Sequence, residues 1–139
     1  MNNKELMNLA ADNIRLLAVS MVEKAKSGHP GGAMGGADFI NVLFSEFLVF
    51  DPERPEWEGR DRFYLDPGHM SPMLYSALAL QGKFTIDELK TFRQWGSVCP
   101  GHPERDIMHG IENTSGPLGQ GHTYAVGAAI AEKFLEARL

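Results

Sequence analysis

Four of the five histidines directly follow a glycine, in the pairs Gly28-His29, Gly68-His69, Gly101-His102 and Gly121-His122. A residue without Cβ tolerates backbone angles that are closed to other residues, and it lets the main chain approach a ligand closely. Near neutral pH an imidazole can donate a hydrogen bond, accept one, or carry a proton, which suits phosphate, hydroxyl and carbonyl oxygens. The pairs therefore predict loops that bring imidazoles against a polar ligand.

Three of these histidines are the candidate functional residues. His29, His69 and His102 each lie in a glycine-bearing loop that follows a helix or a strand. His109 lies in a loop with no partner signal, and His122 opens a helix where a neutral imidazole can cap the backbone, so both are predicted to be structural. A zinc site is disfavoured, because the sequence has no HxxxH pattern and a single cysteine.

A second glycine-rich loop, residues 116–121 with the sequence GPLGQG, feeds a helix. Free backbone N–H groups before a helix can meet an anion or the polar edge of a ring. No strand precedes the loop and no Lys-Ser/Thr pair follows it, so neither a dinucleotide-binding fingerprint nor a P-loop fits. Leu118, held between glycines, has two readings: it contacts a ligand, or it fills a gap beneath the loop.

These loops need elements to position them, and the hydrophobic spacing predicts mainly helices. Helices are expected at 4–26, at 37–50 with a buried apolar side, from Pro72 to Gly82, from the Thr85 capping box to Trp95, and from about 125 onward. Residues 27–32, 51–59 and 97–121 are expected to be loops. The best strand candidate is 62–65, directly before the second glycine-histidine pair.

One strand cannot form a sheet, and a strand followed by a glycine-rich turn and a helix is the layout of a parallel α/β unit. The last helix shows no stop signal before Leu139. The sequence therefore predicts an α/β fold in which residues 1–139 form the helix-rich first portion of a parallel-sheet domain that continues past Leu139. Alternatively, the last helix frays into solvent.

Composition excludes several classes. The chain has 139 residues, of which 43% are hydrophobic and 22% charged, with a net charge of −5 and no basic stripe, so nucleic acid and anionic lipid are not expected as partners. No apolar run of about 18 residues is present, and charged residues interrupt the first twenty, so neither a membrane span nor a signal peptide fits. Cys99 cannot form an internal disulfide. We expect a cytoplasmic protein.

From about Asn8 onward the segments resemble, in order, the amino-terminal part of transketolase. The matching stretches are Lys24-Ala25-Lys26-Ser27-Gly28-His29-Pro30-Gly31, Asp61-Arg62-Phe63, Pro67-Gly68-His69, Pro100-Gly101-His102-Pro103-Glu104, Gly110-Ile111-Glu112 and Ser115-Gly116-Pro117-Leu118-Gly119-Gln120-Gly121. Each stretch alone is modest, and the ordered set is highly specific.

The resemblance implies a thiamin diphosphate enzyme that moves a two-carbon ketol unit between sugar phosphates. His29 and His102 would be the catalytic histidines, since they would contact the substrate oxygens and the hydroxyls of the covalent intermediate. His69 would contact both the cofactor diphosphate and the substrate. The carbanion chemistry belongs to the cofactor, and the protein supplies orientation and hydrogen bonds.

The resemblance also implies a cofactor-binding role for Gly116, Pro117 and Leu118. Gly116 would offer its main chain to the aminopyrimidine, and Leu118 would hold the two cofactor rings bent. The family binds magnesium through a Gly-Asp-Gly…Asn motif, and no Gly-Asp-Gly occurs in this sequence. The magnesium ligands and the glutamate that activates the pyrimidine are therefore expected outside the chain. We expect weak cofactor binding and no activity from the chain alone.

The expected partners follow from this implication: sugar phosphate substrates, a C-terminal transketolase section or subunit, and a second copy in a homo-oligomer. Met70-Ser71-Pro72 is closer to the split form of the enzyme, and whether the chain is a truncation or a natural subunit stays open. Two alternatives remain. One is another thiamin diphosphate enzyme, of the deoxyxylulose-phosphate synthase or 2-oxo acid dehydrogenase type. The other is a non-catalytic interaction module on the same scaffold.

Overall fold

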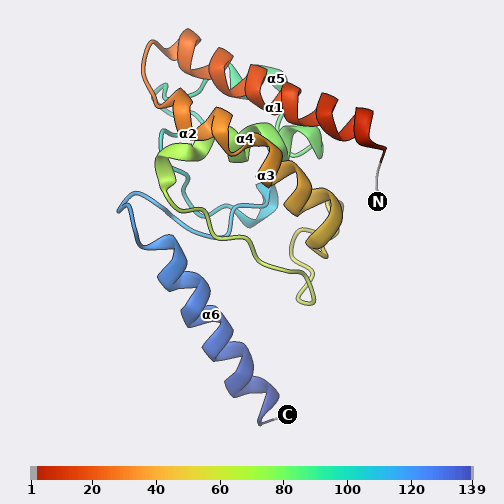
Figure 1. Cartoon of the computed structure of the whole chain (residues 1–139). Helices are drawn as coiled ribbons and strands as arrows, with labels where there is room; N and C mark the ends of the chain where they lie inside the picture. The colour runs from red at the N-terminus through yellow and green to blue at the C-terminus, as the bar shows by residue number, and fades with distance from the viewer. Residues whose placement is uncertain (1–2, 139) are drawn as a thin grey trace.

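A computed structural model describes residues 3–138, and the order of its elements is seen in Figure 1. The elements are α1 (Lys4–Ala25), α2 (Pro30–Gly35), α3 (Ala37–Val42), the π-helix η1 (Leu43–Phe47), the 3-10 helix η2 (Gly68–Met70), α4 (Ser71–Leu80), α5 (Ile86–Leu89), the 3-10 helix η3 (Ile107–His109) and α6 (Gly121–Glu136). We refer to residues 3–115 as the helical body and to residues 116–138 as the C-terminal arm.

The helical body is built around α4. All residues from Ser71 to Leu78 are buried, and the helix packs against α1, α2 and α3. Its apolar side chains join those of α1 and α3 in one core, which includes Ile14, Ile40 and Leu74. α4 begins at Ser71 and has Pro72 in its first turn, where proline is tolerated, so the helix start predicted at Pro72 is off by one residue. The loops that carry the histidines lie at the ends of these packed helices.

The strand predicted at 62–65 is wrong. The segment has no strand partner within residues 3–138, where the only bridge pairs Asp106 with Ile111. Instead, the Leu65 N–H donates to the side-chain oxygen of Asn113 (2.9 Å), and the Asn113 amide donates back to the Leu65 carbonyl (3.2 Å). One buried asparagine thus satisfies the backbone groups that a neighbouring strand would have satisfied. The helix-rich character of the α/β prediction is confirmed, whereas its parallel sheet is not seen in the described part of the chain.

Two predicted segments at the start of the chain differ from the structure. The glycine-rich stretch 27–32 is not all loop, because Pro30 begins the short helix α2. The helix predicted over 37–50 is α3 followed by the π-helix η1, which ends at Phe47. Its apolar side is only partly buried, since Ile40 is fully buried whereas Phe47 is 70% exposed. The spacing of apolar residues could not show that the rest of the fold covers Ile40 and leaves Phe47 exposed.

The helix predicted from the Thr85 capping box starts correctly and ends early. The Thr85 hydroxyl accepts from the Glu88 N–H (3.2 Å), and the Glu88 carboxylate accepts from the Thr85 N–H (2.7 Å). Regular helix stops at Leu89, and turns follow up to Gly96, where φ is +74°. Trp95 is fully exposed, so it offers no buried face that would extend the helix.

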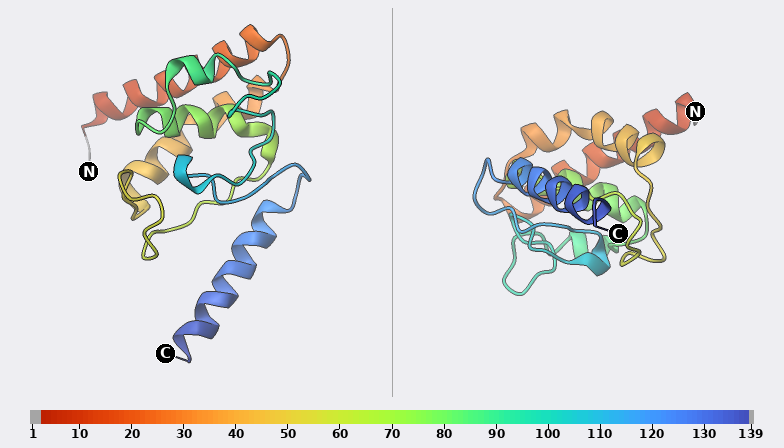
Figure 2. Two further views of the ribbon diagram at one scale, coloured as in Figure 1. Left: turned by 180° about the vertical axis from the view of Figure 1, so that it is seen from behind. Right: turned by 90° about the horizontal axis from the view of Figure 1, so that it is seen from below.

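The C-terminal arm projects away from the helical body in Figure 1, and the left view of Figure 2 shows the same from behind. Its apolar side chains are exposed, including Val126, Ile130 and Phe134. In the described part of the chain, no helix has both the length and the apolarity that a membrane crossing requires.

Candidate active site

His29 and His69 meet although forty residues separate them. His29 is the N-cap residue of α2, and His69 lies in η2 immediately before α4. Their ring centroids are 4.8 Å apart, with the planes tilted by 51°. Gly28, which precedes His29, has φ of +135°, a conformation that L side chains rarely adopt. The two glycine-histidine loops therefore place two imidazoles side by side at the ends of two packed helices.

Gly68 packs the His69 loop against the start of the GPLGQG loop. A Cβ added at Gly68 would lie 2.0 Å from the carbonyl oxygen of Ser115, which no structure can accommodate without moving the backbone. Ser115 directly precedes Gly116. The glycine of this pair is thus explained by a close approach of two main chains, and that approach brings His69 near the loop that carries Leu118.

The loop of His102 is tied to the same region. The Ser71 hydroxyl, at the start of α4, donates to the carbonyl of Gly101 at 2.7 Å. Burial lowers the pKa of His102 below its ordinary value of 6.5, and the charges of Arg93, His69 and His29 lower it further. His69 and His29 are therefore near enough to influence the charge of His102, and its uncharged form is favoured near neutral pH.

The GPLGQG loop is open to solvent at the positions predicted to bind a cofactor. Gly116, Pro117 and Leu118 are exposed. Leu118 is 53% exposed, so it does not fill a gap beneath the loop. A Cβ at Gly116 would meet nothing within 4 Å. The loop thus presents bare main chain and one apolar side chain.

Asp66 holds this loop, and the sequence analysis missed it. Its carboxylate accepts from the Gly119 N–H at 2.9 Å and lies 3.1 Å from Nδ1 of His122. The Gly119 hydrogen bond, followed by the His122 contact, lowers the pKa of Asp66. The available signal was its place directly before Pro67-Gly68-His69. His122 therefore has a carboxylate partner on the loop of another histidine.

His109, for which the sequence predicts a structural role, contacts two neighbouring side chains. Its Nδ1 lies 2.6 Å from the Asp106 carboxylate, and its ring stacks on Phe84 at 4.6 Å with planes 20° apart. The contacts fix the turn η3 against the core, away from the three converging imidazoles. Among residues 3–138, no group of three or more His, Cys, Asp or Glu side chains is arranged to hold a metal ion.

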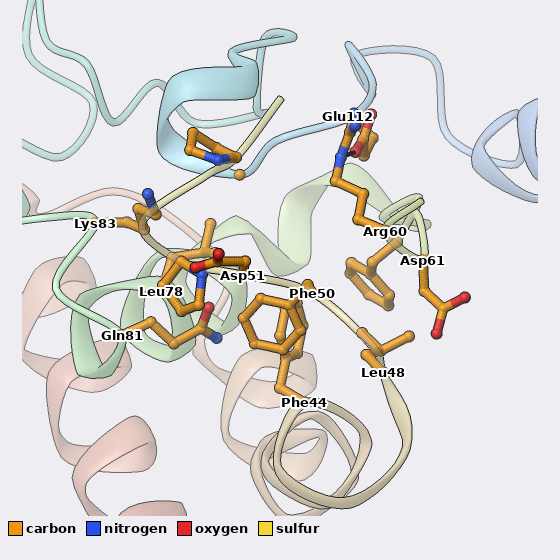
Figure 3. A pocket seen from close by; sticks show the side chains of 14 residues that line it. Phe44, Leu48, Phe50, Asp51, Arg60, Asp61, Leu78, Gln81, Lys83 and Glu112 are labelled. Carbon is orange, nitrogen blue, oxygen red and sulfur yellow. Dashed lines mark hydrogen bonds and ion pairs between the residues drawn. The ribbon is translucent and has the colours of Figure 1, made fainter. Parts of the chain in front are cut away.

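A separate apolar cavity of about 40 Å³ lies between η1, the 50–63 segment and α4, and Figure 3 shows it. Phe44 and Phe50 line it on one side, and the Arg60–Glu112 ion pair (2.8 Å) closes another. None of the three converging histidines contributes to it. It has the volume of a packing gap, so the candidate site is the histidine cluster and not this cavity.

The family described as "Transketolase, thiamine diphosphate binding domain" matches residues 6–139. The chain belongs to the transketolase family. The resemblance expected from the motifs is thereby confirmed. The three histidine loops and the GPLGQG loop all fall within the matched residues.

Curated transketolases share about half of the residues. The transketolase of Rhodobacter capsulatus is 53% identical over 130 residues, which cover 92% of this chain and 19% of that protein. Transketolase-1, chloroplastic, of Arabidopsis thaliana is 49% identical over 98% of this chain and 19% of its own length. The chain therefore spans about a fifth of the length of these relatives.

Solved transketolases have the same fold over this region. Transketolase from Leishmania mexicana superimposes with a TM-score of 0.86 at 47% identity, covering 91% of this chain and 19% of that chain. Transketolase from Pichia stipitis, solved as a complex with sedoheptulose 7-phosphate, superimposes with a TM-score of 0.82 at 43% identity, covering 90% and 18%. The helical arrangement is thus that of the corresponding fifth of known transketolases.

Proposed function

We propose that this chain supplies the first part of a transketolase active site, in which thiamin diphosphate carries a two-carbon ketol unit from one sugar phosphate to another. The observation that supports it is the contact between the His29 and His69 rings beside an open glycine loop, with the His102 loop tied to the start of α4. The relative from Pichia stipitis is described with a sugar phosphate bound, which fits imidazoles placed to meet hydroxyl and phosphate oxygens.

The residues present fit the cofactor. The main chain at Gly116 is exposed with nothing within 4 Å of its missing side chain, so a flat aminopyrimidine can reach it. Pro117 stiffens the loop, and the exposed Leu118 offers the apolar contact that would keep the cofactor rings bent. His69, against the start of the same loop, would donate to the diphosphate. When bound, thiamin diphosphate supplies the electron sink for cleavage beside the ketose carbonyl.

His29 and His102 would hold the substrate and move protons at its hydroxyls. His29 is exposed at the N-terminus of α2, so its ring is free to contact a ligand. The pKa of His102 is lowered, mainly by burial, so an uncharged ring can accept a hydroxyl proton near neutral pH. General acid-base help of this kind typically contributes about 10²- to 10⁴-fold.

The proposal assigns the remaining parts of the site to protein outside this chain. The sequence has no Gly-Asp-Gly, which is part of the family's magnesium motif. The magnesium ligands and the pyrimidine-activating glutamate would therefore come from a C-terminal transketolase section or subunit. A homo-oligomer is part of the proposal, because that glutamate usually crosses a dimer interface in the family. We place the complete enzyme in the cytoplasm.

A chimera tests the function. The chain replaces the matching first fifth of the Rhodobacter capsulatus transketolase, and ketol transfer between sugar phosphates is measured. We expect an active chimera in which His29→Ala, His69→Ala and His102→Ala each lower kcat/KM by about 10²- to 10⁴-fold. His109→Ala is the matched control and should keep kcat/KM. A folded, cofactor-loaded chimera without activity would contradict the proposal and indicate a non-catalytic module.

Calorimetry tests the dependence on the missing parts. The 139-residue chain is titrated with thiamin diphosphate in the presence and absence of magnesium. We expect weak binding or no heat, because a diphosphate held by loop amides and one imidazole lacks its metal clamp. Tight, metal-dependent binding by this chain would show that it holds its own magnesium ligands.

A further inference from the structure

Arg93 stands in a backbone conformation that its residue type rarely adopts. Its φ is +60°, in the left-handed region, although it is neither glycine nor asparagine. Its own N–H donates to the carbonyl of Cys99 at 3.0 Å, closing the 93–99 loop behind it. The surroundings of Arg93 therefore hold it in a strained backbone conformation.

The guanidinium lies between two of the glycine-histidine loops. Its Nη1 donates to the hydroxyl of Ser27 at 3.1 Å, two residues before His29. On the other side, a Cβ added at Gly101 would lie 2.8 Å from Nε and 3.0 Å from Cζ of Arg93. Gly101 directly precedes His102. One side chain therefore contacts the approaches to both histidines, which are 73 residues apart in the sequence.

The neighbouring residue supports the same junction. Phe92 is buried, and a Cβ at Gly28 would meet its ring at 3.2 Å, so the 92–93 segment packs along the whole approach to His29. The Arg93 guanidinium also lies 5.7 Å from the centroid of the Phe92 ring. Within residues 3–138, Nε of Arg93 is buried and has no hydrogen-bond partner. The Ser27 hydroxyl and the Phe92 ring are the contacts that hold the guanidinium in place.

These contacts connect the three histidine loops to one another. Arg93 joins the His29 loop to the His102 loop, the Ser71 hydroxyl joins the His102 loop to the His69 helix start, and the His29 and His69 rings meet at 4.8 Å. The groups whose charges lower the pKa of His102 are Arg93, His69 and His29. Of these three groups, Arg93 is the one that stays charged throughout the neutral pH range.

We propose that Arg93 is a positioning residue, which clamps the His29 loop to the His102 loop and so sets the relative placement of two of the three imidazoles. The glycine of the Gly101-His102 pair is required by this clamp, because any side chain there would displace the guanidinium. The consequence for ketol transfer rests on the proposed function, whereas the clamp itself is a property of this chain and can be measured without ligand.

The first experiment uses NMR on the 139-residue chain with isotope-labelled histidine. Arg93→Gln removes the clamp and its charge, Arg93→Lys keeps only the charge, and Gly101→Ala displaces the guanidinium while leaving Arg93 in the sequence. We expect all three to shift the ring resonances of both His29 and His102. The titration midpoint of His102 should rise in Arg93→Gln and stay near that of the unmodified chain in Arg93→Lys.

Two further variants make this NMR experiment more specific. Ser27→Ala removes only the hydrogen bond, so it should shift His29 more than His102. Arg105→Gln removes an exposed arginine of the neighbouring loop and serves as the matched control, with both rings unchanged. Ring resonances of His29 and His102 in Arg93→Gln and Gly101→Ala that coincide with those of the unmodified chain would overturn the clamp.

The second experiment places the same variants in the active chimera. A misplacement of about 1 Å in a catalytic group can cost about 10²-fold in rate, so Arg93→Gln should lower kcat by about tenfold or more with a smaller effect on KM. Arg93→Lys should recover part of the loss, and Arg105→Gln should lose nothing. Displaced imidazoles with unchanged kcat would overturn the positioning role. If the NMR resonances show displaced imidazoles in the 139-residue chain but the unmodified chimera is inactive, the clamp is supported. That result would contradict only the proposed function.

Discussion

The helical body and the C-terminal arm hold their parts of the site by different means. In the body, the histidine loops are fixed by buried neighbours: Gly68 lies against Ser115, and the hydroxyl of the fully buried Ser71 holds the Gly101 carbonyl. In the arm, Leu118 and the side chains of α6 are exposed, and the carboxylate of Asp66 ties the loop to the body. The imidazoles are thus preorganised by the core, whereas the exposed leucine loop is held by the Asp66 carboxylate, which contacts Gly119 and His122, and by the close approach of Gly121 to the Leu65 carbonyl.

The largest expected difference between the two regions is in the cost of losing an apolar side chain. Leu78, in α4, is 1% exposed, and Ile130, in α6, is 65% exposed. Leu78→Ala should lower the free energy of unfolding by about 2–5 kcal/mol, because it leaves a cavity in the core. Ile130→Ala should change it by less than about 0.5 kcal/mol. Urea denaturation of this chain measures both, and equal losses would contradict the division into body and arm.

A matched pair of glycines at the boundary comes next. Gly68→Ala forces a Cβ to within 2.0 Å of the Ser115 carbonyl, whereas Gly116→Ala meets nothing within 4 Å. We expect Gly68→Ala to lower the free energy of unfolding by about 1–3 kcal/mol, since overpacking must move the backbone. Gly116→Ala should be close to neutral. The same denaturation experiment compares them, and a neutral Gly68→Ala would show that the two loops are not packed together.

Asp66→Asn tests the contact that holds the arm. The substitution keeps an oxygen that can accept from Gly119 and removes the charge that strengthens this bond and the His122 contact. Amide hydrogen exchange at Gly119 should become about fivefold faster, which corresponds to about 1 kcal/mol. Exchange at buried Leu74 in α4 should not change and serves as the control. Unchanged exchange at Gly119 would mean that other contacts hold the loop.

Acidification should affect the two regions in separate pH ranges. Burial, followed by the charges of Arg93, His69 and His29, lowers the pKa of His102 below 6.5 in the folded chain, so the unfolded chain binds this proton more readily. The free energy of unfolding should therefore fall as the pH drops below about 6.5 toward the folded pKa of His102. Asp66 also has a lowered pKa, so its contact with Gly119 persists above about pH 4 and is lost below it.

NMR titration of the His102 ring and of the Gly119 amide measures both transitions. The amide of Leu74 should show neither and serves as the reference. A His102 midpoint at or above 6.5 would contradict the half-buried environment near the Arg93 charge derived for it. A Gly119 transition well above pH 4 would contradict the role of the Asp66 carboxylate.

The glycine-histidine pairs are local signals, because a positive φ or a close approach demands glycine at a particular position, and the sequence displays that glycine. Gly28 has a positive φ, and Gly68 and Gly101 allow close approaches of main chain or guanidinium. The capping box at Thr85 was likewise a local signal and is confirmed, and Pro72 marked the start of α4 to within one residue. The roles assigned to the three histidines stay predictions until ligand contacts are measured.

What could not be predicted depends on partners distant in the sequence. A side-chain amide at Asn113 completes the backbone bonds of Leu65, so an extended segment forms without a strand partner. Asp66 and Arg93 contribute to the site through contacts 53 and 66 residues away, to Gly119 and Ser27, and no periodic pattern marks such pairs. Hydrophobic spacing also could not tell how much of η1 its neighbours would cover.

The most direct test of the convergent site is a nuclear Overhauser measurement between the imidazole ring protons of His29 and His69 in the 139-residue chain. Ring centroids 4.8 Å apart predict a cross-peak between the two rings, with none between either ring and His109. A folded chain with no His29–His69 cross-peak would contradict the account, because the loops would then present their imidazoles to separate surfaces.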